Sequence, residues 1–313
     1  MTGVSSIGAS AFEGCTSLKS AVIPNVDDIN PCVFKGCTSL SKLGLSPSLT
    51  NIDYEAFKNC TSLSSITIPS TVNYMEGEAF AGSGLVTANI KSSSALSIDN
   101  GGGGQFKDCT NLTKVTLPSS GCEIPNNCFE NCNNLQTVYD LYKCTKIGNN
   151  AFFGCSALTN NNIGRCTSIG DNAFRGCSSI TKMTVKHGAT MGDNSFMGCW
   201  NIGTLYNLYW TSSIGDNALS GVSLSNNTIT SLDSGLTSKS LSGCLNDSWN
   251  LPNIYVYEAM AKNWYGANQG VTLKCKDGVT ISNYQDSLTI INGTKKVLLK
   301  GIVDGNALVA AGY

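Results

Sequence analysis

An aromatic position recurs along the chain at an almost constant interval. Nine phenylalanines, followed by two leucines in the same role, are separated by 22, 23, 23, 26, 23, 23, 22, 22, 23 and 22 residues. A period this regular over eleven units indicates stacked repeats, because a unit of this length cannot bury its apolar face alone. The positions are Phe12, Phe34, Phe57, Phe80, Phe106, Phe129, Phe152, Phe174, Phe196, Leu219 and Leu241.

Each unit repeats the same internal order of residues. An aliphatic residue stands five positions before the aromatic in all units but the fifth. Apolar residues follow six, nine and eleven positions after it and spell L-x-x-L-x-L, as in Leu63, Ile66 and Ile68. A cysteine stands three positions after the aromatic in nine units. These cysteines are Cys15, Cys37, Cys60, Cys109, Cys132, Cys155, Cys177, Cys199 and Cys244.

This order predicts a solenoid, an α/β or β-rich horseshoe with repeats of about 22–23 residues. The L-x-x-L-x-L segment suits a short strand whose apolar side chains point inward, and stacked strands should pair into a parallel, concave sheet. The preceding segment, residues 170–176 in one unit, begins with good capping residues and ends at a glycine. We therefore expect a short helical or 3₁₀ turn on the convex side.

The recurring pattern I-G-x-x-A-F-x-G-C-x-x-L-x-x-(L/I)-x-(L/I)-P, seen in residues 7–18 and 60–69, resembles the BspA-type leucine-rich repeat family. The resemblance covers roughly residues 4–245 and implies a leucine-rich repeat solenoid. It also implies a surface or secreted protein of bacteria or protists that adheres to host proteins or other cells, and related repeats occur in bacteriophage proteins. The repeat is a scaffold signature and identifies no ligand.

The regular pattern ends before the chain does, which predicts three parts. They are a repeat array of about eleven units in 1–245, a C-terminal cap in 246–270, and a small β-hairpin-rich module in 271–313. In the cap, 251–256 reads as a strand and 257–264 as a short amphipathic helix. Strand-like runs in the module, separated by turns such as Asn292-Gly293-Thr294, lie at 271–275, 279–281, 287–291 and 296–300.

Charge and hydropathy exclude several classes of partner. Charged residues are 13% of the chain and the net charge is −1, so no basic stripe suited to nucleic acid is visible. No apolar run reaches the ~18–20 residues of a membrane span. Residues 1–6 lack the regions of a signal peptide. The sequence therefore predicts either a fragment of a secreted protein, placed outside the cell or at its surface, or a protein of a phage virion.

The chain has fifteen cysteines, and most repeat at one core position. Reduced, packed thiols explain that column better than disulfides do, and zinc is disfavoured because no C-x-x-C pair exists. Cys122, Cys128 and Cys132 lie closest together in sequence and are the first place to expect a disulfide.

Groups for catalysis are scarce. His187 is the only histidine, and Asp171, Asp193 and Asp216 recur where turn capping explains them. No catalytic residue, metal site or cofactor is predicted, and the chain is expected not to be an enzyme.

Outward positions of the predicted strands suggest a binding surface. Tyr139 and Tyr206 stand between the last two apolar residues of their strands, so they should point out of the concave sheet. Aromatic and amide side chains together suit protein or glycan contacts, although ordinary surface packing also explains them. The remaining candidate ligand-binding residues are Thr137, Asn160, Asn162, Lys182, Thr184 and Thr204.

Two functions follow from this sequence. The first is a non-enzymatic recognition or adhesion protein that presents its concave face to a protein or glycan on host or neighbouring cells. The alternative is a structural subunit of a phage virion or surface assembly, with the solenoid as a rod and its ends as contacts. In that case self-association would use the N-terminal coil or residues 271–313.

Overall fold

The computed structural model describes most of the repeat array and several later strands. These parts are residues 4–96, 102–160, 162–186, 188–202, 204–206 and 213–222, and the strands β17 (Thr228–Ile229), β18 (Asn253–Val256), β19 (Ser287–Asn292), β20 (Lys295–Gly301) and β21 (Leu308–Gly312). The chain divides into two compact units, Met1–Asn160 and Asn161–Tyr313. Successive coils of a parallel β-solenoid fill the first unit and the start of the second, which confirms the predicted leucine-rich repeat solenoid.

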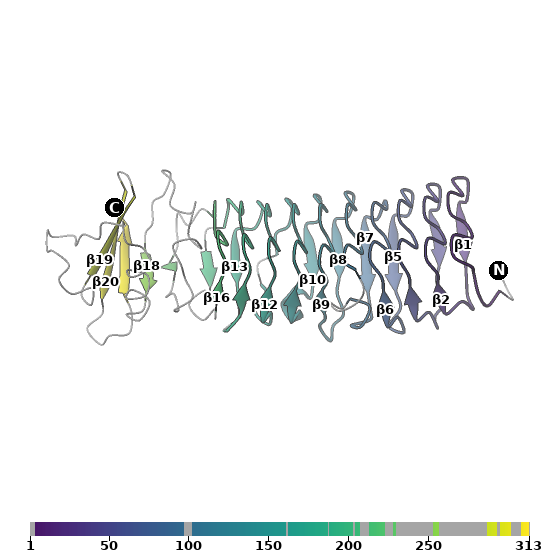
Figure 1. The fold of residues 1–313 in the computed structure, drawn as a ribbon, viewed down its shortest axis with the longest axis horizontal. Coiled ribbons are helices and arrows are strands. Elements are labelled where there is room, and N and C mark those ends of the chain that lie inside the picture. Colours follow the sequence, from purple (N-terminus) through teal and green to yellow (C-terminus); the bar gives the residue numbers. More distant parts are fainter. Residues whose placement is uncertain are drawn as a thin grey trace. The chain divides into compact units, whose positions relative to one another are not determined.

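In the first six coils the L-x-x-L-x-L segment forms a strand, and Figure 1 shows these strands stacked side by side. They are β1 (Ser20–Val22), β3 (Lys42–Gly44), β5 (Ser65–Ile68), β7 (Thr87–Ile90), β8 (Lys114–Thr116) and β10 (Thr137–Tyr139). All pairing is parallel, β1 with β3 and then β5, β7, β8 and β10 in order. Two parallel sheets result, because β3 and β5 do not pair.

A second column of strands forms at the aliphatic position before the aromatic. Its two-residue strands are β2 (Asp28–Ile29), β4 (Asn51–Ile52), β6 (Tyr74–Met75), β9 (Glu123–Ile124) and β11 (Lys146–Ile147). The pairs β2–β4, β4–β6 and β9–β11 are parallel. The sequence predicted the buried aliphatic there but not a strand, because two residues are too few to show an alternating pattern.

The expected helical turn is instead a run of tight turns. Around Phe34, alternate amides bond within the coil, as Lys35 N–H does to the Cys32 carbonyl (3.1 Å). The amides between them bond to the next coil, as Phe34 N–H does to the Ala56 carbonyl (2.8 Å). Among the described residues the one helical element is the 3₁₀ helix η1 (Leu141–Lys143). The turn side is therefore a third inter-coil ladder.

Two columns of left-handed residues make these turns possible. The residue two positions after the aromatic has positive φ, as in Gly36 (72°) and Asn59 (59°), which explains the glycine that so often precedes the cysteine. The residue two positions before it does the same, and Asn is frequent there because it tolerates this conformation. Within that column lie Ser10, Cys32, Glu55, Glu78, Asn127 and Asn150, and in the second unit Asn172, Asn194 and Asn217.

The recurring phenylalanines form the centre of the core. From Phe34 to Phe152 every one is fully buried. Consecutive rings in the first unit stack with centroids 5.0 to 5.5 Å apart and planes within 15°. Aromatic rings at this separation attract one another in addition to the apolar area that they bury.

The second unit begins with coils of the same kind. The longer strands β13 (Lys182–Thr184) and β15 (Thr204–Tyr206) pair in parallel, as do β12 (Ser168–Ile169), β14 (Thr190–Met191) and β16 (Ser213–Ile214) in order. Farther along the chain, β17 pairs in parallel with β18. β18 also pairs with β21, β21 with β20, and β20 with β19, all antiparallel.

The C-terminal strands agree with the sequence at two places. β18 lies within the strand expected at 251–256, and β19 and β20 form the hairpin expected around Asn292-Gly293-Thr294. β21 was not predicted, and it joins a strand of the expected cap to strands of the expected module in one sheet. The runs at 271–275 and 279–281 and the helix at 257–264 lie outside the described residues. The predicted division at 245 and 270 stays a prediction.

Candidate functional site

The outward face of the first unit's longer strands is polar and carries little charge. Register places Ser65, Thr87, Lys114 and Thr137 in one column, and Thr67, Asn89, Thr116 and Tyr139 in the other. Each of these side chains is exposed or half-buried, whereas the residues between them are buried. This alternation follows from the period of two in a strand.

Tyr139 lies on the last strand of this face, as the sequence predicted. Its side chain is 49% exposed, and Thr137 beside it is half-buried. The helix η1 follows directly and adds Tyr142, which is 45% exposed. The Lys143 ammonium lies 5.4 Å from the centroid of the Tyr142 ring. The two tyrosines form an exposed aromatic edge, and the half-buried Lys143 beside them is ion-paired with Asp140 at 3.0 Å.

In the second unit the candidate residues are placed by their strand register. Lys182 pairs with Thr204 and Thr184 with Tyr206, and Asn162 forms a single parallel bridge with Thr184. Lys182 and Asn162 are exposed, and Thr184 is half-buried. The side chains of Thr204 and Tyr206 lie outside the described part of the chain.

Asn160 has a local structural role that the sequence did not show. Its Oδ1 accepts a hydrogen bond from Val138 N–H (2.6 Å), and its Nδ2 donates one to the Val138 carbonyl (2.9 Å). Both main-chain groups of a strand residue are thereby satisfied by one side-chain amide.

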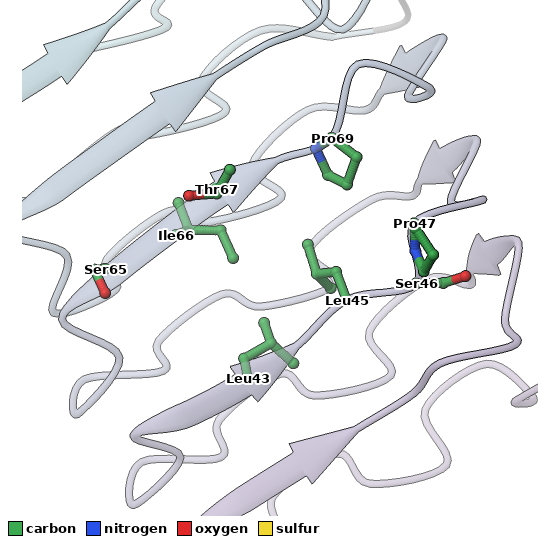
Figure 2. A pocket seen from close by; sticks show the side chains of 8 residues that line it. All are labelled: Leu43, Leu45, Ser46, Pro47, Ser65, Ile66, Thr67 and Pro69. Atoms are coloured by element: carbon green, nitrogen blue, oxygen red, sulfur yellow. The ribbon is translucent and has the colours of Figure 1, made fainter. Parts of the chain in front are cut away.

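A pocket that the sequence did not reveal lies where β3 and β5 fail to pair. It has a volume of about 380 Å³, and Figure 2 shows Leu43 and Leu45 on one side and Ile66 on the other. Ser65 and Thr67 line it from β5, and Ser46, Pro47 and Pro69 lie at the end where the strands stop. Leu43 and Leu45 are partly exposed here, whereas their counterparts in the neighbouring coils, such as Ala21 and Ile23, are buried.

The turn side of the first unit carries an ion-pair cluster around Glu55. This side chain is 8% exposed and contacts Lys35 at 2.5 Å and Lys58 at 2.6 Å, and Lys58 also reaches Glu78. Burial alone would raise the pKa of Glu55, but hydrogen bonds from Lys35, Lys58 and Tyr54 outweigh it and lower the pKa to about 2. The cluster is satisfied internally and holds three consecutive coils together.

The described cysteines are all free thiols, and most are buried. Cys60, Cys132 and Cys155 each donate from Sγ to the carbonyl of the aromatic one coil earlier, at 3.1 Å. Burial raises the pKa of Cys60 to about 12, so the thiol keeps its proton at neutral pH. The column therefore consists of packed hydrogen-bond donors. The sequence predicted a disulfide first among Cys122, Cys128 and Cys132, and all three are free thiols. The sulfur of Cys122 lies 3.7 Å from that of Cys144 in the next coil.

The recurring aspartates serve as caps between coils. Asp171 Oδ1 accepts Asp193 N–H (2.8 Å), and Asp193 Oδ1 accepts Asp216 N–H (2.7 Å). His187 lies outside the described residues. Over the described residues, no group of three or more His, Cys, Asp or Glu side chains is arranged to hold a metal ion. That same part of the chain contains no helix of the length and apolarity that a bilayer crossing requires.

Comparisons with known proteins agree with this repeat. The sequence profile described as "BspA type Leucine rich repeat region (6 copies)" matches residues 1–102, 92–203, 140–248 and 189–265. No curated protein matches the chain.

Among solved structures, a leucine-rich repeat protein of T. pallidum is 25% identical, with 57% of this chain and 74% of that one covered and a TM-score of 0.42. One from Eubacterium ventriosum is 26% identical, covering 53% and 44%, with a TM-score of 0.47. A leucine rich cell surface protein of Faecalibacterium prausnitzii is 23% identical, covering 63% and 62%, with a TM-score of 0.38. With the profile matched over most of its length and the repeat seen coil by coil, the chain belongs to the BspA-type leucine-rich repeat family.

Proposed function

We propose that this protein is a non-catalytic recognition or adhesion protein. Its ligand is a protein or glycan on a host or neighbouring cell, bound on the outward face of the longer strands. The protein acts outside the cell or at its surface. In the second unit, Asn162, Lys182, Thr184, Thr204 and Tyr206 belong to the corresponding face.

The observation that carries the proposal is the outward surface of β5, β7, β8 and β10. Its two in-register columns are mostly Ser, Thr and Asn, and one of them ends at the exposed Tyr139. Side chains at strand spacing present a regular array of hydroxyl and amide groups on a rigid backbone. An exposed tyrosine beside them supplies apolar area together with a polar tip, which is the combination enriched in protein contacts.

The proposal is tested by screening the intact chain against a glycan array and a panel of immobilised secreted proteins. Tyr139→Ala should weaken any hit by about tenfold or more, because an anchoring aromatic contributes a kilocalorie or more. Tyr54→Ala is the matched control, since Tyr54 is 45% exposed but lies on the turn side. Equal loss with both variants, with circular dichroism unchanged, would contradict a site on the strand face.

The alternative, a structural subunit, gives a different result in the same preparation. Light scattering of the intact chain at several concentrations should then show a defined oligomer, and Tyr139→Ala should leave it unchanged. A recognition protein should stay monomeric.

A further inference from the structure

The edges of β3 and β5 that face each other do not pair, so main-chain groups that bond to the next coil elsewhere in the first unit lack that partner here. In the first and fifth coils, the amide eleven positions after the aromatic bonds to the next coil: Ile23 N–H to the Gly44 carbonyl (3.0 Å) and Leu117 N–H to the Tyr139 carbonyl (3.2 Å). Leu45 occupies this position in the second coil. Among the described residues, its N–H group has no main-chain acceptor in the next coil. The ladder is therefore interrupted at this coil.

The register identifies the groups that face the gap. Lys42 N–H bonds to the Lys19 carbonyl (3.2 Å), so the even-numbered residues of β3 face β1. Because neighbouring residues of a strand direct their N–H and C=O groups to opposite edges, Leu43 and Leu45 direct theirs into the gap. On β5, Ser64 and Ile68 accept from the coil of β7, so Ser65 and Thr67 face the gap from the other side.

The chain closes another interruption of the same ladder with an amide. Val138 stands nine positions after its aromatic, as Leu43 does after Phe34, and both its main-chain groups bond to the Asn160 side chain. An amide group therefore fits beside this strand position. Its N–H and C=O groups take the places that the main-chain groups of the next strand would otherwise occupy.

A side-chain amide also replaces a main-chain partner in the column of two-residue strands that contains β2, β4 and β6. The carbonyls of Ile29 and Ile52 each accept a main-chain amide of the next coil at 2.8 Å. At Met75 the carbonyl instead accepts Gln105 Nε2 at 3.3 Å. A side-chain amide thus completes the bond where the fifth coil departs from the repeat. Between β3 and β5 no side chain of the described residues does this.

The walls of the gap limit what can complete it. Leu43, Leu45 and Ile66 are apolar, whereas Ser65 and Thr67 are neutral and exposed. Alternating donors and acceptors at strand spacing, with apolar side chains on the inner side, are the features that an extended peptide pairs with when it adds to a sheet edge. A single side-chain amide pairs with one residue, as Asn160 does with Val138, whereas an extended peptide offers its amides to Leu43, Leu45, Ser65 and Thr67 at once.

We propose that the gap between β3 and β5 binds an extended peptide segment of a partner protein as an added strand. Its backbone amides pair with Leu43 and Leu45 on one side and with Ser65 and Thr67 on the other. Alternate side chains, small and apolar, enter the pocket against Leu43 and Ile66. This site shares Ser65 and Thr67 with the outward face but not Tyr139, which lies three strands away on β10, and its test does not use the ligand of that face.

The test uses the intact protein, labelled with ¹⁵N-leucine, and the peptide acetyl-Thr-Lys-Val-Thr-Leu-amide, which repeats residues 113–117, a strand of this same ladder. We expect saturable shifts of the Leu43 and Leu45 amide signals at millimolar peptide, the affinity range of a few backbone hydrogen bonds. The same peptide N-methylated on alternate amides should cause no shift. Absence of shifts with the unmodified peptide, or equal shifts with the methylated one, overturns the proposal.

A variant of the protein tests the site from the other side. Ser65 stands eight positions after its aromatic, as Asn160 does, so Ser65→Asn offers the gap an amide of the chain's own and should weaken peptide binding about tenfold or more. Thr87→Asn is the matched control, because Thr87 pairs in register with Ser65 on a strand whose ladder is complete. Binding unchanged in Ser65→Asn, or weakened equally in both variants, contradicts the site. The Tyr139→Ala variant should bind the peptide normally.

Discussion

The stacked phenylalanines allow a quantitative prediction about stability. Phe129 is fully buried, and its ring stacks on Phe106 at 5.5 Å and on Phe152 at 5.3 Å. Replacing a buried phenylalanine by alanine costs about 3–5 kcal/mol in total, and the loss of two ring contacts, each worth about 0.5–1.5 kcal/mol, places Phe129 in the upper part of that range. We therefore expect Phe129→Ala to lower the free energy of unfolding by about 4–5 kcal/mol. Phe12 is half-buried and stacks on Phe34 alone, at 5.4 Å, so Phe12→Ala should cost about 1–2 kcal/mol.

Urea unfolding followed by far-ultraviolet circular dichroism measures both variants. Each coil contacts only its neighbours, so Phe129→Ala should also broaden the transition as the coils on either side lose their coupling. Phe129→Leu separates the two contributions, because it keeps much of the apolar volume and removes the ring contacts. A difference below about 1 kcal/mol between Phe129→Ala and Phe12→Ala would refute the view that the central stack dominates the core.

Three further predictions concern the polar groups inside the array. Because the pKa of Glu55 is lowered to about 2 from an ordinary value of 4.5, its ion pairs stabilise the fold fully above about pH 4.5 and are lost as the pH falls toward 2. This loss is at most about 3 kcal/mol, since water screens the partly exposed lysines, and Glu55→Gln should flatten acid unfolding curves in that range. Cys132→Ser, which keeps a donor for the Phe106 carbonyl, should cost less than Cys132→Ala in urea unfolding, and the reverse order would show that packing alone matters. Asn160→Ala should cost about 1–3 kcal/mol by leaving Val138 unpaired, whereas a thermally unchanged variant would rule out that role.

Much of the fold could be predicted from the sequence because its determinants repeat. The spacing of the phenylalanines gave the coils, and the L-x-x-L-x-L segments gave the longer strands from β1 to β15. Tyr139 could be placed on the outward face because strand side chains alternate. These features depend on the order of residues within one repeat. Because that order recurs in many repeats, it can be recognised in the sequence without knowledge of the contacts between coils.

The turn geometry and the gap could not be predicted in the same way. The amides near Phe34 bond alternately within and between coils, so their conformation depends on the next coil as well as on local propensity. Leu43, Leu45 and Ile66 follow the same pattern as residues of closed coils, and nothing in their spacing shows that β3 and β5 stay apart. The sequence predicts Asn160 as a surface amide, and its hydrogen bonds to Val138 become evident only in the structure. Each of these features is a property of two coils together.

The central claim is that the ladder is open between β3 and β5 and closed on either side. Amide hydrogen exchange of the free, intact protein, resolved by residue, tests it most directly. Ile23, Leu45 and Leu117 occupy the same position in their coils, and only the first and last have a partner carbonyl among the described residues. We expect the Leu45 amide to exchange at least about a hundredfold faster than those of Ile23 and Leu117, which open only with the surrounding coils. Equal protection of all three amides would show that β3 and β5 pair in solution and would contradict both the gap and the peptide site built on it.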